Sequence, residues 1–221
     1  KLAYYLAIFA MVFGSTFGSL NSANAAEVSL GNGGTSSLDD EINEAADTLV
    51  SAVNATTHAI SMADGDVTAA SLANATAGDM VITVTDDDAA AAGTFTITGD
   101  ITATAADLTI KTDDNAVTLS FGGNMTEDGE AMLVQLDATG ILDITGTAVN
   151  IDAKIDGIAD GEGTFNVTGT ATFDDAIGSV KEIAAMSVSG ASTFGTTVDV
   201  EAITVTADTT VTGALKADTI G

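Results

Sequence analysis

The pentapeptide Phe95-Thr96-Ile97-Thr98-Gly99 decides the fold, because close copies of it recur along the chain. In each copy an apolar residue is followed by any residue, by a residue that is usually β-branched, by Thr or Ser, and then by Gly. The copies are 142–146 (LDITG), 165–169 (FNVTG), 186–190 (MSVSG), a variant that departs at its first residue, 209–213 (TTVTG), and a degenerate form, 118–122 (TLSFG). Alternation of apolar residues with Thr predicts a strand, and Gly predicts the turn that ends it.

These copies are evenly spaced. Their final glycines stand at 99, 122, 146, 169, 190 and 213, so the separations are 23, 24, 23, 21 and 23. A second strand-like run lies between successive glycines, at 108–111, 133–136, 149–155, 180–183 and 198–205. A fixed period of this length indicates stacked repeats. We therefore predict a mainly β chain in which residues 67–221 form a β-solenoid, or β-helix, with coils of about 23 residues.

The repeated residues also predict how the coils pack. We expect each turn Gly to be needed for a positive φ angle, which Gly adopts at little steric cost. Phe173 and Phe194 each lie four positions after a repeat Gly, so we expect Phe residues, like rows of Thr, to stack from coil to coil. The alternative architecture is a pair of β-sandwich domains, whose short strands recur every ~8–12 residues.

The residues before the repeats have a different pattern. Residues 26–36 are Gly-rich and predict a flexible lead. Apolar residues then recur at spacings of three, four and seven, namely Leu38, Ile42, Ala45, Leu49, Val53 and Ile60. This helical stripe, with Ser36 and Ser37 as candidate N-caps, predicts one amphipathic helix over residues 37–63. We expect it to pack on the end of the solenoid, and self-association through a heptad-like seam is the alternative.

Residues 1–25 resemble a secretory signal. Lys1 precedes an apolar run from Leu2 to Phe13, and Ala23-Asn24-Ala25 has the A-x-A form of a cleavage site. The run is shorter than the roughly 20 apolar residues of a membrane span. We therefore expect cleavage after Ala25, no membrane span in the mature form, and an extracellular or cell-surface location. A retained N-terminal helix is the alternative.

Composition excludes several classes of function. Acidic residues number 32 and basic residues 5, which gives a net charge of −27 that would repel nucleic-acid phosphates. The chain has no Cys, which excludes disulfides and thiolate sites. His58 is its single imidazole, and beyond the signal only five Phe supply aromatic rings. We therefore predict no catalytic residues and no enzymatic activity.

Runs of Asp in turns predict a possible calcium site. The first candidates are Asp86, Asp87, Asp88, Asp113 and Asp114, and further pairs are Asp39-Asp40 and Asp174-Asp175. Ca²⁺ takes roughly six to eight oxygen ligands, which carboxylates in turns can supply, although no EF-hand spacing is present. The alternative is an acidic surface in contact with solvent. Copies that each carry −27 would repel one another, so we expect divalent cations or salt to assist any assembly.

In its Ala-rich signal, its Cys-free acidic body and its repeated V-T-G units, the chain resembles bacterial or archaeal surface-layer, extracellular-filament and repeat-adhesin proteins. Its ending, Val211 to Gly221, is also similar to phage tail-fibre repeats. The resemblance covers most of 67–221 and implies a secreted structural subunit of a coat or filament. Such a subunit would self-associate into a homopolymer by pairing strand edges, with cell-surface polysaccharide as a further possible partner. An adhesin stalk and a polysaccharide-acting β-helix enzyme are the alternatives.

Overall fold

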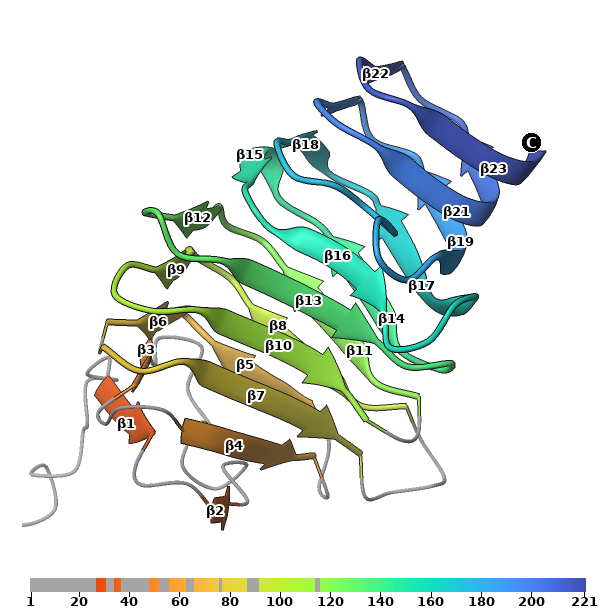
Figure 1. Ribbon diagram of the computed structural model, residues 1–221. Helices are drawn as coiled ribbons and strands as arrows, with labels where there is room; N and C mark the ends of the chain where they lie inside the picture. Colours follow the sequence, from red (N-terminus) through yellow and green to blue (C-terminus); the bar gives the residue numbers. More distant parts are fainter. Residues whose placement is uncertain are drawn as a thin grey trace, which may run out of the picture.

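The computed structural model describes residues 27–30, 34–36, 48–51, 56–62, 66–75, 77–86, 92–113 and 116–221. In this part of the chain the secondary structure consists of short strands, which stack into three sheets along one axis (Figure 1). Every strand pair is parallel, as the pairing of β7 with β10 and of β8 with β11 illustrates. The chain therefore winds round one axis and adds one strand to each sheet with most turns.

Three sheets form the walls of the stack. The six-stranded sheet contains β2 (Gly34–Ser36), β4 (Thr56–Ser61), β7 (Met80–Thr85), β10 (Leu108–Thr112), β13 (Met132–Leu136) and β16 (Lys154–Gly157). The eight-stranded sheet contains β5 (Val67–Ala69), β8 (Thr94–Ile97), β11 (Thr118–Phe121), β14 (Ile141–Ile144), β17 (Glu162–Val167), β19 (Ile183–Val188), β21 (Val198–Val205) and β23 (Leu215–Ile220). The nine-stranded sheet contains β1 (Glu27–Leu30), β3 (Thr48–Ser51), β6 (Ser71–Asn74), β9 (Ile101–Ala103), β12 (Met125–Glu127), β15 (Thr147–Ile151), β18 (Thr170–Phe173), β20 (Ser192–Phe194) and β22 (Thr209–Val211).

This topology confirms the predicted β-solenoid. Each coil visits the six-stranded, the eight-stranded and then the nine-stranded sheet, as β10, β11 and β12 do. A β-sandwich is built from antiparallel strands, so the all-parallel pairing excludes that alternative. Parallel strands need a crossover between them, and here the crossover is the rest of the coil.

The core lies inside the coils and is built from alternate residues of each strand. In β10, for example, Leu108, Ile110 and Thr112 are buried while Thr109 and Lys111 are half-buried. Register then places like residues above one another and fills the narrow interior with continuous apolar columns. One such column runs through Phe95, Leu119, Leu142, Phe165 and Met186.

The predicted stacking of Phe and Thr is confirmed in the nine-stranded sheet. The rings of Phe173 and Phe194 stack with their centroids 4.7 Å apart and their planes 6° from parallel. On the outer face of the same strands, Thr172, Thr193 and Thr210 occupy equivalent positions of three successive coils. Identical side chains thus repeat at the spacing of the strands, about 4.8 Å.

The repeat glycines are required for a reason other than the predicted one. They line the corner between the eight- and nine-stranded sheets, and their φ angles are not positive, unlike those of Gly129, Gly161, Gly163 and Gly178. A Cβ added to Gly146, Gly169 or Gly190 would lie less than 3.0 Å from the carbonyl oxygen of the glycine one coil earlier. Close approach of successive backbones therefore excludes any side chain here.

The last coils are shorter than the predicted period. Phe95 pairs with Leu119, a step of 24 along the sequence, whereas Met186 pairs with Ile203, a step of only 17. In the earlier coils a strand of the six-stranded sheet, a corner and a strand of the eight-stranded sheet follow one another. In the last coils the single eight-residue strand β21 takes the place of all three. For this reason Gly213 lies against Thr196 in a different corner, and its assignment as the sixth repeat glycine is wrong.

The helix predicted over residues 37–63 is wrong in the described part of that range, where the chain forms β3 and β4. In β4, His58 and Ile60 are buried while Thr57 is exposed, so the true period is two. The apparent helical stripe joined residues of separate strands. Pairing of all six residues of β4 with β7 outweighs a local helical preference. The remainder, 37–47, 52–55 and 63, lies outside the described residues.

Other predictions concern the first residues of the chain. Residues 27–30 and 34–36, which we expected in a flexible lead, form β1 and β2 and pair with β3 and β4. The predicted signal, residues 1–25, lies outside the described residues. The part of the chain that the structure describes contains no helix long and apolar enough to cross a membrane.

Candidate cation site at the acidic corner

Two of the carboxylates that we predicted as calcium ligands, Asp86 and Asp113, lie at the corner between the six- and eight-stranded sheets. Asp86 follows β7 and is buried, and its Oδ2 accepts a hydrogen bond from the amide of Gly93 at 2.7 Å. Asp113 follows β10 and is exposed. The other three predicted ligands, Asp87, Asp88 and Asp114, lie outside the described residues. Asp86 thus helps to close its own loop, and calcium binding by these five residues stays a prediction.

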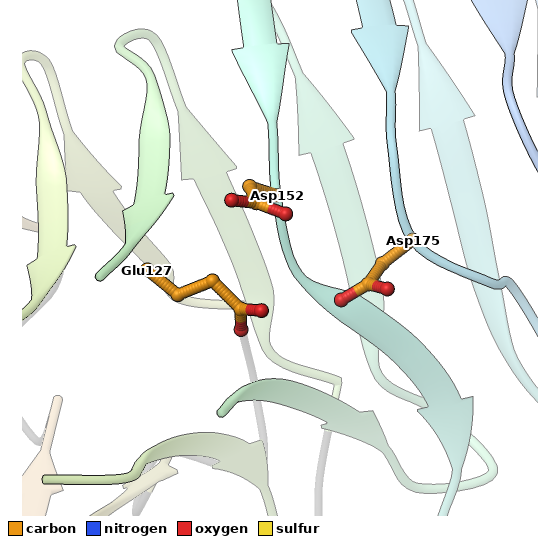
Figure 2. Close-up of side chains that lie close together, drawn as sticks. All are labelled: Glu127, Asp152 and Asp175. Carbon is orange, nitrogen blue, oxygen red and sulfur yellow. The ribbon is translucent and has the colours of Figure 1, made fainter. Parts of the chain in front are cut away.

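A different set of carboxylates converges at the corner between the nine- and six-stranded sheets, which we call the acidic corner. Glu127, Asp152 and Asp175 each offer one carboxylate oxygen, and these oxygens lie within 4.8 Å of one another. The side chains come from successive coils and approach one another across the stack (Figure 2). All three are partly buried.

Strand register brings these residues together. Met125 pairs with Ile151, and Ile151 pairs with Phe173, so the ends of β12, β15 and β18 lie side by side. Glu127 closes β12, and Asp152 and Asp175 follow the ends of β15 and β18. Adjacent rungs are about 4.8 Å apart, which is within reach of a carboxylate on each.

Hydrogen bonds from the backbone hold two members of the cluster. Glu127 Oε2 accepts a hydrogen bond from the amide of Met132 at 2.9 Å, across the turn that leads into β13. This bond fixes the Glu127 side chain at the corner and leaves its second carboxylate oxygen available to a ligand. Asp152 in turn accepts a hydrogen bond from the backbone of Glu127, which opposes the rise of its pKa, so the backbone anchors two of the three carboxylates.

Burial and mutual repulsion raise the pKa values of two members of the cluster, Glu127 and Asp152. Burial raises the pKa of Glu127, the charges of Asp152 and Asp175 raise it further, and the Met132 amide opposes them. Burial also raises the pKa of Asp152, with further contributions from Asp175 and Asp174. A raised carboxyl pKa means that the folded chain binds protons more tightly here than the unfolded chain does.

The same geometry could bind a cation. Carboxylate oxygens are hard ligands that suit Ca²⁺, which needs roughly six to eight oxygens and accepts water among them. A divalent ion between the three carboxylates would offset their mutual repulsion. Binding and protonation would then compete for the same oxygens.

Sequence reasoning missed two of these ligands because it searched for consecutive Asp residues. Asp175 belongs to a pair that we noted, but Asp152 has no acidic neighbour in the sequence and Glu127, which precedes Asp128, is not part of a run of Asp. The available signal was their spacing, since the steps from Glu127 to Asp152 and from Asp152 to Asp175, 25 and 23 residues, each differ by one residue from the local coil steps of 26 and 22. In a solenoid, acidic residues one coil apart are neighbours.

A second feature is a shallow cavity of 410 Å³ on the outer face of the nine-stranded sheet. Its lining comes from β15, β18, β20 and β22 and includes Asn150, Thr172, Thr193 and one titratable group, Asp208. These small polar side chains could donate and accept hydrogen bonds with an uncharged polar ligand.

Comparisons with known proteins add no relationship. No protein-family model, no curated protein and no solved structure matches this chain.

Proposed function

We propose that the chain is a secreted structural protein, a subunit of an extracellular coat or filament that assembles by pairing strand edges between copies. The observation that carries the proposal is the parallel stack of coils, in which each strand presents the same backbone groups to the next and of which β23 is the last described strand of the eight-stranded sheet (Figure 1). One side of β23 pairs with β21, and its other side has no strand partner in the described part of the chain.

Side chains on this edge occupy core positions. Leu215 pairs with Val198 and Ile220 pairs with Ile203, both of which are buried. Leu215 is nevertheless 40% exposed and Ile220 66% exposed, because no further rung covers them within the described structure. A strand laid on β23 would bury both side chains and extend the apolar columns by one coil.

Backbone pairing supplies affinity without special side chains. An exposed parallel edge presents amide and carbonyl groups that accept any strand of matching register. In this proposal the first coil of another copy provides that strand, so copies add end to end. Secretion, the remaining part of the proposal, is supported by the resemblance of residues 1–25 to an export signal.

We expect the net negative charge of each copy to make assembly sensitive to cations. Each copy has a net charge of −27, so contact between copies is unfavourable unless ions screen it. We propose that Ca²⁺ assists assembly, with the acidic corner and the predicted Asp86 and Asp113 as the residues to test. Assembly should then increase with calcium and decrease with EDTA.

The test compares two variants that each add one Lys to the final coil. Leu215→Lys places a charge at a core position of the open edge, whereas Thr210→Lys places it on the outer face of β22, where it is exposed. Light scattering and negative-stain images of the full chain should show filaments or lattices for wild type and Thr210→Lys. Leu215→Lys should leave single subunits with unchanged circular dichroism.

Two results would contradict the proposal. Equal assembly of both variants would mean that β23 is not the contact. Monodisperse rods in every sample, with or without calcium, would favour an adhesin stalk, since a solenoid that does not polymerise is a rigid spacer.

A further inference from the structure

One buried column of the six-stranded sheet contains a histidine among aliphatic side chains. Register aligns five inward-facing residues of successive strands, namely His58, Ile82, Ile110, Val134 and Ile155. All five are buried, and His58 is only 2% exposed. The imidazole of β4 therefore occupies the position that Ile or Val fills in the later coils, and it is the one titratable group of the column.

The described strands around His58 bring no other charge toward it. β2, β3, β5, β6 and β7 contain no acidic or basic residue, and β4 contains only His58. The charged residues nearest in sequence lie beyond the strand ends: Asp66 before β5 and Asp79 before β7 are exposed, and Asp86 lies four positions after Ile82, roughly 13 Å along the strand. A protonated imidazole would therefore lose its hydration without a carboxylate from these strands to replace it.

Burial favours the neutral imidazole in the folded chain. It lowers the pKa of His58 below the ordinary value of 6.5, which an exposed imidazole in the opened strand regains. Below that value the open form binds a proton that the closed form does not, so the fraction of open strand increases as the pH falls. Opening disturbs little of the stack, because beyond β4 the described part of the six-stranded sheet contains only β2, a strand of three residues.

We propose that His58 is a pH-sensitive switch, which opens the first described coils in mildly acidic solution while the later coils stay folded. This inference rests on the proposed function in one respect, since those coils supply the strand that would pair with β23 of another copy. Their opening would therefore stop end-to-end assembly. Protonation of carboxylates acts in the opposite direction, because it removes repulsion between acidic copies. Loss of assembly on mild acidification is thus the specific effect of His58.

Hydrogen exchange of the dilute full chain tests the switch without assembly. Between about pH 7.5 and about pH 5.5, the protection factor of the β4 amides should fall about tenfold, because opening takes up one proton. Protection factors are corrected for the intrinsic pH dependence of exchange. The amides of β13, in a coil whose column residue is Val134, are the internal control and should keep their protection.

Two neutral substitutions separate the imidazole from other effects of acid. His58→Leu continues the aliphatic column, and His58→Gln keeps a polar group that does not titrate. In both variants the protection of β4 should be equal at the two pH values, even if His58→Gln lowers it at both. The switch is excluded if wild-type β4 is equally protected at both pH values, or if His58→Leu loses as much protection as wild type.

Light scattering of wild type and His58→Leu at the same two pH values tests the link to assembly. Wild-type filaments should dissociate at the lower pH, whereas His58→Leu filaments should persist. Filaments of wild type that persist although β4 has opened would overturn the link. An absence of filaments at both pH values, with the exchange results as expected, would overturn the proposed function and leave the switch intact.

Discussion

The corner between the eight- and nine-stranded sheets and the acidic corner belong to the same coils but pack in opposite ways. At the first, which we call the Thr–Gly corner, Gly146 and Gly169 pack against each other and Thr168 bonds to the preceding coil. At the acidic corner, Glu127 and Asp152 face each other as like charges. At the first corner successive backbones touch, whereas at the second like-charged side chains lie close together.

The difference shows that the effect of a side chain on stability in this fold depends on the residue one coil away. Stacking repeats each local environment about every 4.8 Å, so a favourable contact and an unfavourable one are both multiplied along the axis. Small residues at the Thr–Gly corner make that repetition possible. Carboxylates at the acidic corner oppose it, because the like charges of successive coils repel one another.

The largest effect is expected from filling the Thr–Gly corner. Gly169→Val should lower the free energy of unfolding by more than about 3 kcal/mol, because the new side chain would overlap the backbone of Gly146, which no rotamer change relieves. The measurement is the urea midpoint followed by circular dichroism.

Gly129→Ala is the matched control for the glycine. Gly129 has a φ of +83° and nothing within 4 Å of an added Cβ, so the substitution should cost only about 1 kcal/mol of backbone strain. Equal destabilisation by the two variants would mean that close approach does not explain the repeat glycines.

A smaller effect is expected from the hydroxyl of the same corner. Thr168→Val keeps the side-chain shape and removes the hydrogen bond to the carbonyl of Ile144, which should cost about 1 kcal/mol or less. Thr172→Val, at an exposed position of β18, is its control and should leave the urea midpoint unchanged. Indistinguishable midpoints for wild type and both variants would show that the corner hydroxyls do not stabilise the stack.

The smallest effect, opposite in sign, is expected at the acidic corner. Asp152→Asn should raise the free energy of unfolding at pH 7 by about 0.5 kcal/mol, because it removes like-charge repulsion with Glu127 and Asp175. Asp128→Asn removes the same charge from an exposed neighbouring position and is the control. If Asp128→Asn stabilises as much, the gain comes from net charge alone.

Protonation should have the same effect as this substitution. Because the pKa values of Glu127 and Asp152 are raised on folding, stability should increase as the pH falls from 7 toward 4.5, the ordinary value for Glu127. The increase should be smaller in Asp152→Asn. Comparing the two thermal melting curves cancels the contribution of His58, whose lowered pKa acts in the opposite direction. Parallel pH profiles would contradict a shifted pKa at this corner.

The repeat and its strands could be predicted from the sequence because each coil repeats one chemical pattern. The spacing of the repeat glycines predicted the coil length. The equivalent positions of Phe173 and Phe194 predicted a stacking contact, which the strand register confirms. The physical reason why Gly is required at these positions could not be predicted from their spacing. A turn and a close approach both require Gly, and only the position of Gly146 against Gly169 distinguishes them.

The errors arose where neighbours outside the local segment decide the structure. The apolar spacings that suggested a helix are spread over residues 38–60, yet β7 provides a complete set of pairing partners for residues 56–61 as a strand. The acidic corner depends on residues that lie a full coil apart in the sequence, so no local motif marks it. Once the coil length is known, residues one period apart are the first place to look for a site.

The central claim, that β23 binds a strand of another copy, is tested most directly by hydrogen exchange of its backbone amides. The account predicts that amides of 215–220 exchange rapidly in dilute subunits and become protected in assembled material, while those of β10 in the middle of the stack stay equally protected in both. Assembled material in which the β23 amides exchange as fast as in the dilute subunit would contradict it.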